Sequence, residues 1–279
     1  MIKNLPTHLD FEQFLVKEYF RLGSINKVFH EHRFNLPISF AGYDRVLNKF
    51  KVVKSAGPNS KLSESLHVLS LLANYKIPLE KVYHQLAPKT IQVSINTIHR
   101  ILHYIRLGLV RRRGTALIIS PKDQPNKVLV GNDQSLNNSV LGNKGDLSLP
   151  MGHSKTGEPI RDSIARILQN EVFTDHVINR QFAWNIIPKH IKPIMYINIA
   201  DIQVSVYKLD LPQKYNKFSS LKLSNLNYRD LNSLNKHSLR PGVKEILTNY
   251  STETNNDGVL TINSDLNSRI YALAREQAR

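Results

Sequence analysis

Residues 149–173 read LPMGHSKTGEPIRDSIARILQNEVF. The glycines in the first half predict a loop. Four apolar residues then recur at the spacing of one buried helix face: Ile160, Ile164, Leu168 and Val172. A glycine loop lets the backbone approach a diphosphate, and helical carboxylates one turn apart can hold Mg²⁺. Taken as a helix alone, the segment also fits an ordinary amphipathic helix with Glu171 as a solvated neighbour.

The stretch resembles the signature of the Nudix hydrolases, G-x5-E-x7-REUxEExGU, in which U is an apolar residue. Five positions agree with it: Gly152, Glu158, Arg166, Leu168 and Glu171. Three positions depart from it, because Ile167 and Asn170 replace helical glutamates and Phe173 replaces the late glycine.

The resemblance implies roles for the matching residues and for the loop beside them. It makes Glu171 the catalytic residue and the metal ligand, supported by Glu158 and Arg166. It also makes Gly152, His153 and Gly157 ligand-binding residues. Because one helical carboxylate remains of three, we expect a weak Mg²⁺ site and the loss of most diphosphate hydrolysis.

The order of elements around this stretch extends the resemblance over residues 123–250. Strands are predicted at 127–131, 182–187, 193–207 and 219–223, followed by a helix starting near Asn227 or Tyr228. The fold expected is an α/β/α Nudix-like sandwich with a mixed sheet. Residues 251–279 are expected to form a C-terminal extension, with a strand and a helix docked on the body.

The first 58 residues predict a helix-turn-helix-like helical domain. Helices are expected at 11–22 and 25–32, the second capped by Ser24, and a third is capped by Ser39. The third helix would expose Arg45 and Lys49, which suit DNA phosphates and base edges. Protein-interaction modules are equally built from three short helices.

Residues 59–122 resemble the winged helix-turn-helix fold. Ser94 is expected to cap a helix that buries Ile98, Ile101, Leu102 and Ile105. Residues 109–119 are read as strand, basic turn and strand. The resemblance implies base contacts for four residues of the helix: Asn96, Thr97, Arg100 and His103. It implies phosphate contacts for Arg111, Arg112 and Arg113. Winged helices also serve as protein–protein modules, in which a basic hairpin is a solvated edge.

Charge and composition favour a polyanionic partner for the N-terminal half. The chain has 279 residues, 38 Lys and Arg against 22 Asp and Glu, and a net charge of +16. Residues 1–120 hold 18 of these basic and 7 of the acidic residues. The absence of cysteine excludes disulfides, thiol nucleophiles and Cys-ligated metals. Without a signal segment or long apolar run, we expect a cytoplasmic protein with no membrane partner.

Three functions remain open from the sequence. The first is a transcriptional regulator-like protein that binds double-stranded DNA, senses a nucleotide-type ligand and forms a homodimer. The sequence assigns no cofactor with certainty and leaves Mg²⁺ open. The alternative is a Mg²⁺-dependent Nudix hydrolase of a nucleoside diphosphate derivative, with Glu171 as chief ligand. The third is a scaffold that binds nucleic acid without sequence preference.

Overall fold

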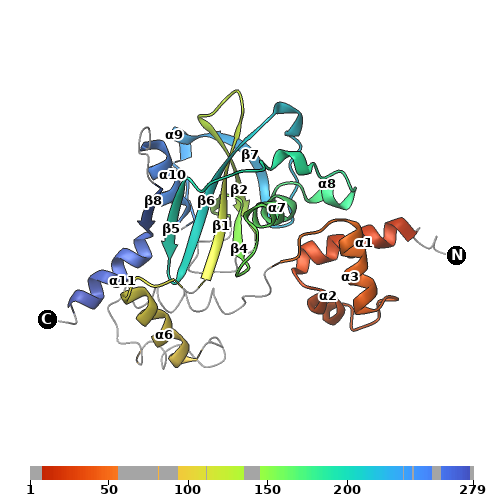
Figure 1. Cartoon of the computed structure of the whole chain (residues 1–279), viewed down its shortest axis with the longest axis horizontal. Coiled ribbons are helices and arrows are strands. Elements are labelled where there is room, and N and C mark those ends of the chain that lie inside the picture. The colour runs from red at the N-terminus through yellow and green to blue at the C-terminus, as the bar shows by residue number, and fades with distance from the viewer. Residues whose placement is uncertain are drawn as a thin grey trace.

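The computed structural model describes residues 8–55, 81, 94–110, 112–134, 145–234, 236–240, 242–252 and 259–276. These residues form a mixed α/β structure in which helices surround a twisted mixed sheet (Figure 1). Within these ranges no helix has the length and apolar character needed to cross a membrane.

Three helices form near the N-terminus, at the expected places. They are α1 (His8–Leu22), α2 (Ile25–Glu31) and α3 (Phe40–Lys49). Ser24 and Ser39 cap α2 and α3, because each hydroxyl accepts a hydrogen bond from a first-turn N–H. Their apolar faces enclose a core that includes Leu15, Phe20 and Tyr43.

The main sheet has five strands in the order β4-β1-β6-β5-β8. Their bounds are β1 Arg112–Pro121, β4 Met151–Ser154, β5 Met195–Ile199, β6 Ile202–Leu211 and β8 Leu260–Asn263. The β1–β6 and β5–β8 pairs are parallel, whereas β1–β4 and β5–β6 are antiparallel. The strand predicted at 193–207 is therefore a tight hairpin, β5 and β6.

A second, antiparallel sheet lies beside the first and has the order β3-β2-β7. It consists of β2 (Lys127–Asp133), β3 (Leu147–Ser148) and β7 (Leu223–Asp230). The strand expected at 127–131 is confirmed as β2. Register shifts between Val130 and Asn132 mark a bulge in the β2–β7 pair.

Helices cover both faces of β1, whose residues alternate between two cores. Leu117 and Ile119 join the core beneath α7 (Ile160–Glu171), whereas Ala116 and Ile118 join the core beneath α6 (Ile95–Arg106). Helices α10 (Val243–Thr252) and α11 (Asp265–Glu276) lie on the α6 side (Figure 1). Shorter helices are α8 (Thr174–Ile178), α9 (Leu231–Leu234), η1 (Trp184–Ile186) and η2 (Gln213–Tyr215).

The basic hairpin expected at 109–119 is wrong. Residues 112–121 form one uninterrupted strand, paired along one side with β6 and at its start with β4. Gly114 serves close packing in this strand, since an added Cβ would lie 3.1 Å from Val204 Cγ2 and 3.3 Å from the Gly152 oxygen. A strand with both faces buried needs apolar residues on both, which the run from Ala116 to Ile119 supplies.

Three further sequence expectations are corrected. Residues 182–187 contain the 3-10 turn η1 (Trp184–Ile186) and no strand, and the strand predicted at 219–223 begins only at Leu223, as β7. Asn227 and Tyr228 lie inside β7 instead of starting a helix. The strand and helix expected in the C-terminal extension are confirmed as β8 and α11. Because β8 pairs with β5, they belong to the main sheet and its core. Most of the residues preceding Ser94 in the predicted winged domain lie outside the described residues.

Candidate ligand site

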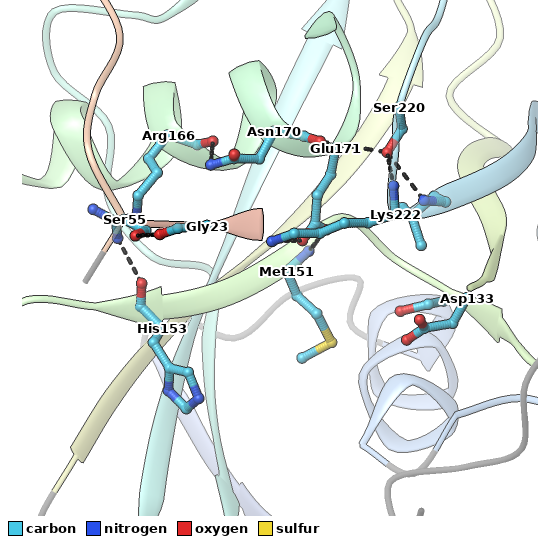
Figure 2. Close-up of polar contacts among 12 residues, drawn as sticks. Gly23, Ser55, Asp133, Met151, His153, Arg166, Asn170, Glu171, Ser220 and Lys222 are labelled. Atoms are coloured by element: carbon cyan, nitrogen blue, oxygen red, sulfur yellow. Dashed lines mark hydrogen bonds and ion pairs between the residues drawn. The ribbon is translucent and has the colours of Figure 1, made fainter. Parts of the chain in front are cut away.

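The loop between β4 and α7 is braced by two residues of the signature. Arg166, 3% exposed in its side chain, forms an ion pair with Glu158, which is 5% exposed. Arg166 also donates to the His153 carbonyl at 2.6 Å (Figure 2), and Lys155 N–H donates to Glu158 at 3.0 Å. Gly157 lies exposed in this loop with φ 73°. Glu158 and Arg166 therefore hold the loop conformation, which leaves neither of them available for a reacting group.

Ile167 packs where the signature has its first helical glutamate. Its side chain is 3% exposed and belongs to the apolar core beneath α7. A Cβ added to Gly152 would lie 2.9 Å from Ile167 Cδ1, so the β4 backbone passes directly over this methyl group. At this position an apolar contact, and not a carboxylate, lies between α7 and β4.

Glu171 is buried and already hydrogen-bonded to the chain. Its Oε2 accepts from Met151 N–H at 2.8 Å, and Lys222 Nζ lies 3.7 Å from Oε1 (Figure 2). Burial raises the pKa of the Glu171 carboxyl above its ordinary value, although Lys222 and the Met151 N–H both oppose this shift. The carboxylate thus joins the end of α7 to the start of β4.

The residues at this end of α7 do not fit a Mg²⁺ ion. Mg²⁺ sites in proteins use carboxylate oxygens in octahedral geometry. Ile167 offers none, and the Asn170 amide donates to the Arg166 carbonyl at 2.8 Å. In the part of the chain that the structure describes, no group of three or more His, Asp or Glu side chains converges as a metal site. The one carboxylate of the signature helix that remains, Glu171, has Lys222 beside it, and Asp133, whose charge also acts on Glu171, is paired with Arg240.

His153 lies on β4 with its side chain directed away from α7, as does that of Met151 (Figure 2). The imidazole is half-buried. Burial, followed by the charges of four cations, lowers the pKa of His153 to about 4. Those cations are Arg112, Arg240, Lys222 and Arg166. At neutral pH a neutral ring therefore offers one donor and one acceptor within a positive field.

Three of these cations are held by carboxylates of β2, of α7 and of the turn between β5 and β6. Arg112 pairs with Asp201 at 2.7 Å, and Arg240 pairs with Asp133 at 2.8 Å. Asp201 and Asp133 are 0% and 2% exposed, whereas the two arginine side chains are each 18% exposed. Lys222, beside Glu171, is 41% exposed. The acidic partners are thus beneath the surface and the cations reach it.

The N-terminal helices dock on α7 and α8 through polar contacts. The fully buried Gln169 donates to the Lys51 carbonyl at 3.0 Å and accepts from Val53 N–H at 2.8 Å. Glu12 of α1 accepts hydrogen bonds from both Lys49 and Arg180, each at 2.7 Å. The Arg180 guanidinium also lies 4.2 Å from the Phe50 ring centroid. Residues of α7 thus contact the loop, the sheet and the N-terminal helices.

The structure separates the residues predicted to contact DNA. On α6, Asn96, Arg100 and His103 are exposed and Thr97 is half-buried, while Ile98, Ile101 and Ile105 are buried as expected. On α3, Arg45 is exposed, but Lys49 binds Glu12. Arg113 is exposed on β1, whereas Arg112 binds Asp201 instead of facing outward in a wing. Arg111 lies outside the described residues.

Sequence reasoning missed the residues that complete the site: Asp133, Gln169, Asp201, Lys222 and Arg240. Asp133 ends β2, two residues beyond the strand predicted at 127–131, and Asp201 lies between β5 and β6; strand ends are common positions for functional carboxylates. Lys222 and Arg240 are isolated cations without a local motif, so only the fold brings them toward His153.

Comparison with protein-family models and with curated proteins finds no match. Solved structures similar to this chain include the Nudix domain of Shewanella oneidensis NrtR complexed with ADP-ribose, at 11% identity and TM-score 0.36. That likeness covers 63% of this chain and 98% of the other. MutT, from a study of the Aliivibrio salmonicida and Vibrio cholerae proteins, has 12% identity and TM-score 0.36, covering 50% and 98%. A Nudix hydrolase from Nitrosomonas europaea has 14% identity and TM-score 0.36, covering 55% and 80%.

Proposed function

We propose that this protein is a transcriptional regulator-like DNA-binding protein whose Nudix-like half binds a nucleotide-type ligand and has lost hydrolysis. The packing of Ile167 against Gly152 carries the second part of this proposal. A buried methyl group occupies the position at which the signature supplies a metal-binding carboxylate. The remaining Glu171 holds the backbone of β4.

The DNA-binding part rests on charge and on the surface of α6. The net charge of +16 favours association with a polyanion. Helix α6 buries one apolar face, and its opposite face carries Asn96, Arg100 and His103, which are residue types that read bases and bind phosphates. We retain Arg45 and Arg113 as candidate phosphate contacts, because both are exposed.

Selection of bound fragments from a random duplex pool at two salt concentrations tests the DNA-binding part. The full-length chain is required, because a fragment starting after residue 121 would lack β1, which β6 and β4 flank in the main sheet. We expect a defined motif for the wild type and a relaxed motif for Arg100→Ala. Binding without enrichment would contradict sequence-specific recognition and favour a scaffold.

A turnover assay on nucleoside diphosphate derivatives with Mg²⁺ or Mn²⁺ tests the loss of hydrolysis. We expect no turnover above a protein-free control. Turnover by the wild type that Glu171→Gln abolishes would instead establish the hydrolase alternative, with Glu171 as a metal ligand.

A further inference from the structure

Two phenylalanines near α2 and α3 are exposed to solvent. Phe34 is 56% exposed and Phe40 is 44% exposed. Both rings pack on the buried ring of Phe29, with centroids 6.1 and 4.0 Å from its own. The two exposed rings therefore belong to one surface, which Phe29 supports from beneath. Large apolar side chains gathered on a surface mark a site of interaction, whereas single exposed ones are ordinary.

The backbone of the turn between α2 and α3 displays Phe34 at a conformational cost. Arg33 and Phe34 have φ of 50° and 59°, in the left-handed region that bulky residues rarely adopt. Arg33 N–H donates to the His30 carbonyl at 3.0 Å, and Phe34 N–H donates to the Phe29 carbonyl at 2.8 Å. The His30 ring also meets the Phe34 ring edge-on, with centroids 4.9 Å apart. Backbone strain retained beneath an exposed ring favours a function for that ring.

The exposed face of α3 continues this surface. The opposite face of the helix packs into the N-terminal core through Tyr43, Val46 and Leu47. The exposed side chains are those of Phe40, Ala41, Arg45 and Asn48, the last three at the spacing of one helical stripe. Each of these residue types has a partner in the major groove. Arginine binds guanine, asparagine binds adenine, and alanine and phenylalanine contact the C5 methyl group of thymine.

Charge favours DNA over a second copy of this chain as the occupant of the surface. Residues 24–51 hold five Lys and Arg against two Asp and Glu. Both carboxylates, Glu31 and Asp44, already have a cation beside them, at 3.7 and 2.5 Å. Arg33 and Arg45 are exposed. Two copies of such a surface would repel each other, whereas the phosphates of DNA attract it.

We propose that Phe34, Phe40 and the exposed face of α3, together called the α3 surface, recognise thymine methyl groups in the major groove of duplex DNA. This inference rests on the proposed DNA-binding function and adds a second base-reading surface to that of α6. The two phenylalanine rings cover thymine methyl groups and remove them from water. Arg33 and Arg45 bind phosphates at the rim of the surface.

Replacement of thymine by uracil tests the proposal, because it deletes only the C5 methyl group. Fluorescence anisotropy compares the motif selected by the full-length chain with duplexes in which each of its thymines in turn is uracil. For the wild type, we expect replacement of a contacted thymine to weaken binding about 4-fold, the value for one apolar carbon returned to water. Phe34→Ala and Phe40→Ala should each weaken binding to the thymine duplex roughly 10-fold and abolish the preference for thymine at the contacted position.

Two further variants separate methyl contacts from other effects. Ile160→Ala is the matched control, since Ile160 is 44% exposed, as Phe40 is, but lies on α7. We expect it to bind every duplex as the wild type does. Arg45→Ala should weaken binding to thymine and uracil duplexes equally and make the salt dependence shallower by about 0.9. The two phenylalanine variants keep every charge, so their salt dependence should equal that of the wild type. Circular dichroism verifies that each variant is folded.

Four results would overturn the inference and leave the proposed function intact. The first three are a selected motif without thymine, equal affinity of the wild type for thymine and uracil duplexes, and an unchanged preference for thymine in both phenylalanine variants. The fourth is a wild-type dimer, seen by sedimentation without DNA, that both variants dissociate, because the surface would then belong to a second copy of the chain. Failure to select any motif contradicts the proposed function itself, and the inference fails with it.

Discussion

In α7, Ile167 is a buried apolar residue at a position where a metal-binding helix would carry a carboxylate. Replacing it by Glu would place a carboxylate in the core beneath α7, against the β4 backbone. We expect Ile167→Glu to reduce the free energy of unfolding by about 3–5 kcal/mol, because a buried charge would have no partner. Urea unfolding measures this. Ile160→Glu is the control, since Ile160 lies on the same helix but is 44% exposed, and its effect should stay within about 0.5 kcal/mol. An Ile167→Glu variant of wild-type stability would contradict the packing role.

We expect Glu171 to stabilise the fold by accepting the hydrogen bond from Met151 N–H. Glu171→Gln keeps an oxygen for Met151 N–H and removes a buried charge, so we expect its stability to equal or exceed that of the wild type at pH 7. Glu171→Ala leaves that N–H without its acceptor and should cost about 1–3 kcal/mol. Thermal unfolding of both variants measures the difference. Equal loss in both would show that the negative charge itself is needed.

The pH dependence of stability gives a second readout on Glu171. Its pKa is raised in the folded state, so folding favours the protonated form. The contribution of this group is present below the ordinary pKa of 4.5 and is lost as the pH rises through the raised folded pKa. We therefore expect the stability difference between Glu171→Gln and the wild type to grow over that interval and then level off. A difference independent of pH would contradict the raised pKa.

At the scale of elements, Gln169 joins α7 to the N-terminal helices. Its amide forms two hydrogen bonds with the backbone that follows α3. We expect Gln169→Ala to increase hydrogen exchange across residues 8–55, because two buried backbone groups lose their partners. Gln181→Ala is the control, since Gln181 is exposed on a neighbouring turn. Unchanged exchange in residues 8–55 would show that Glu12 and the apolar contacts suffice for docking.

The elements that the sequence predicts correctly are those whose signals are local. Ser24, Ser39 and Ser94 cap the helices they were expected to cap, and α7 buries Ile164 and Leu168 as its apolar period predicts, although Ile160 is exposed at its start. The β1 segment was misread because a basic stretch with a glycine and an apolar run fits both a hairpin and a central strand. The structure has the central strand, because β1 pairs with β6, and the paired residues Arg112 and Ile202 are 90 residues apart in the sequence. Hydrophobic periodicity reports only local structure, so it cannot predict such a long-range pairing.

The candidate site was predictable only in its local part. The ion pair between Glu158 and Arg166 spans eight residues, and both residues belong to a recognisable signature. The pairs formed by Arg240 with Asp133 and by Arg112 with Asp201 span 107 and 89 residues. Such pairs follow from strand order. A single sequence therefore reveals the loop and its brace, whereas the cations around His153 require the fold.

At the scale of the whole molecule, two helical segments lie on opposite sides of the main sheet. The N-terminal helices dock on α7, whereas α6 packs on the other face with Met151 of β4 in its core (Figure 1). The His153 side chain lies on this second face, as Met151 does. A ligand bound beside His153 would thus lie on the face against which α6 packs. Coupling between ligand and DNA requires such a shared element.

Salt dependence of DNA binding tests whether the exposed face of α6 contributes phosphate contacts. For a duplex containing the selected motif, the logarithm of the affinity should fall linearly with the logarithm of salt concentration, with a slope of about −0.9 per phosphate contact. If Arg100 contacts a base edge, Arg100→Ala weakens binding to the motif and leaves the slope unchanged. If it contacts a phosphate, the slope becomes shallower by about 1 and all sequences weaken equally.

Arg161→Ala controls for the loss of one positive charge. Arg161 is exposed on α7, which lies across the sheet from α6. Its removal lowers the net charge of the protein by one and leaves the exposed face of α6 unchanged. We expect fluorescence anisotropy titrations to give the wild-type affinity and slope for this variant. If Arg161→Ala and Arg100→Ala weakened binding equally, the attraction would come from the net charge of +16 and α6 would have no special part in it.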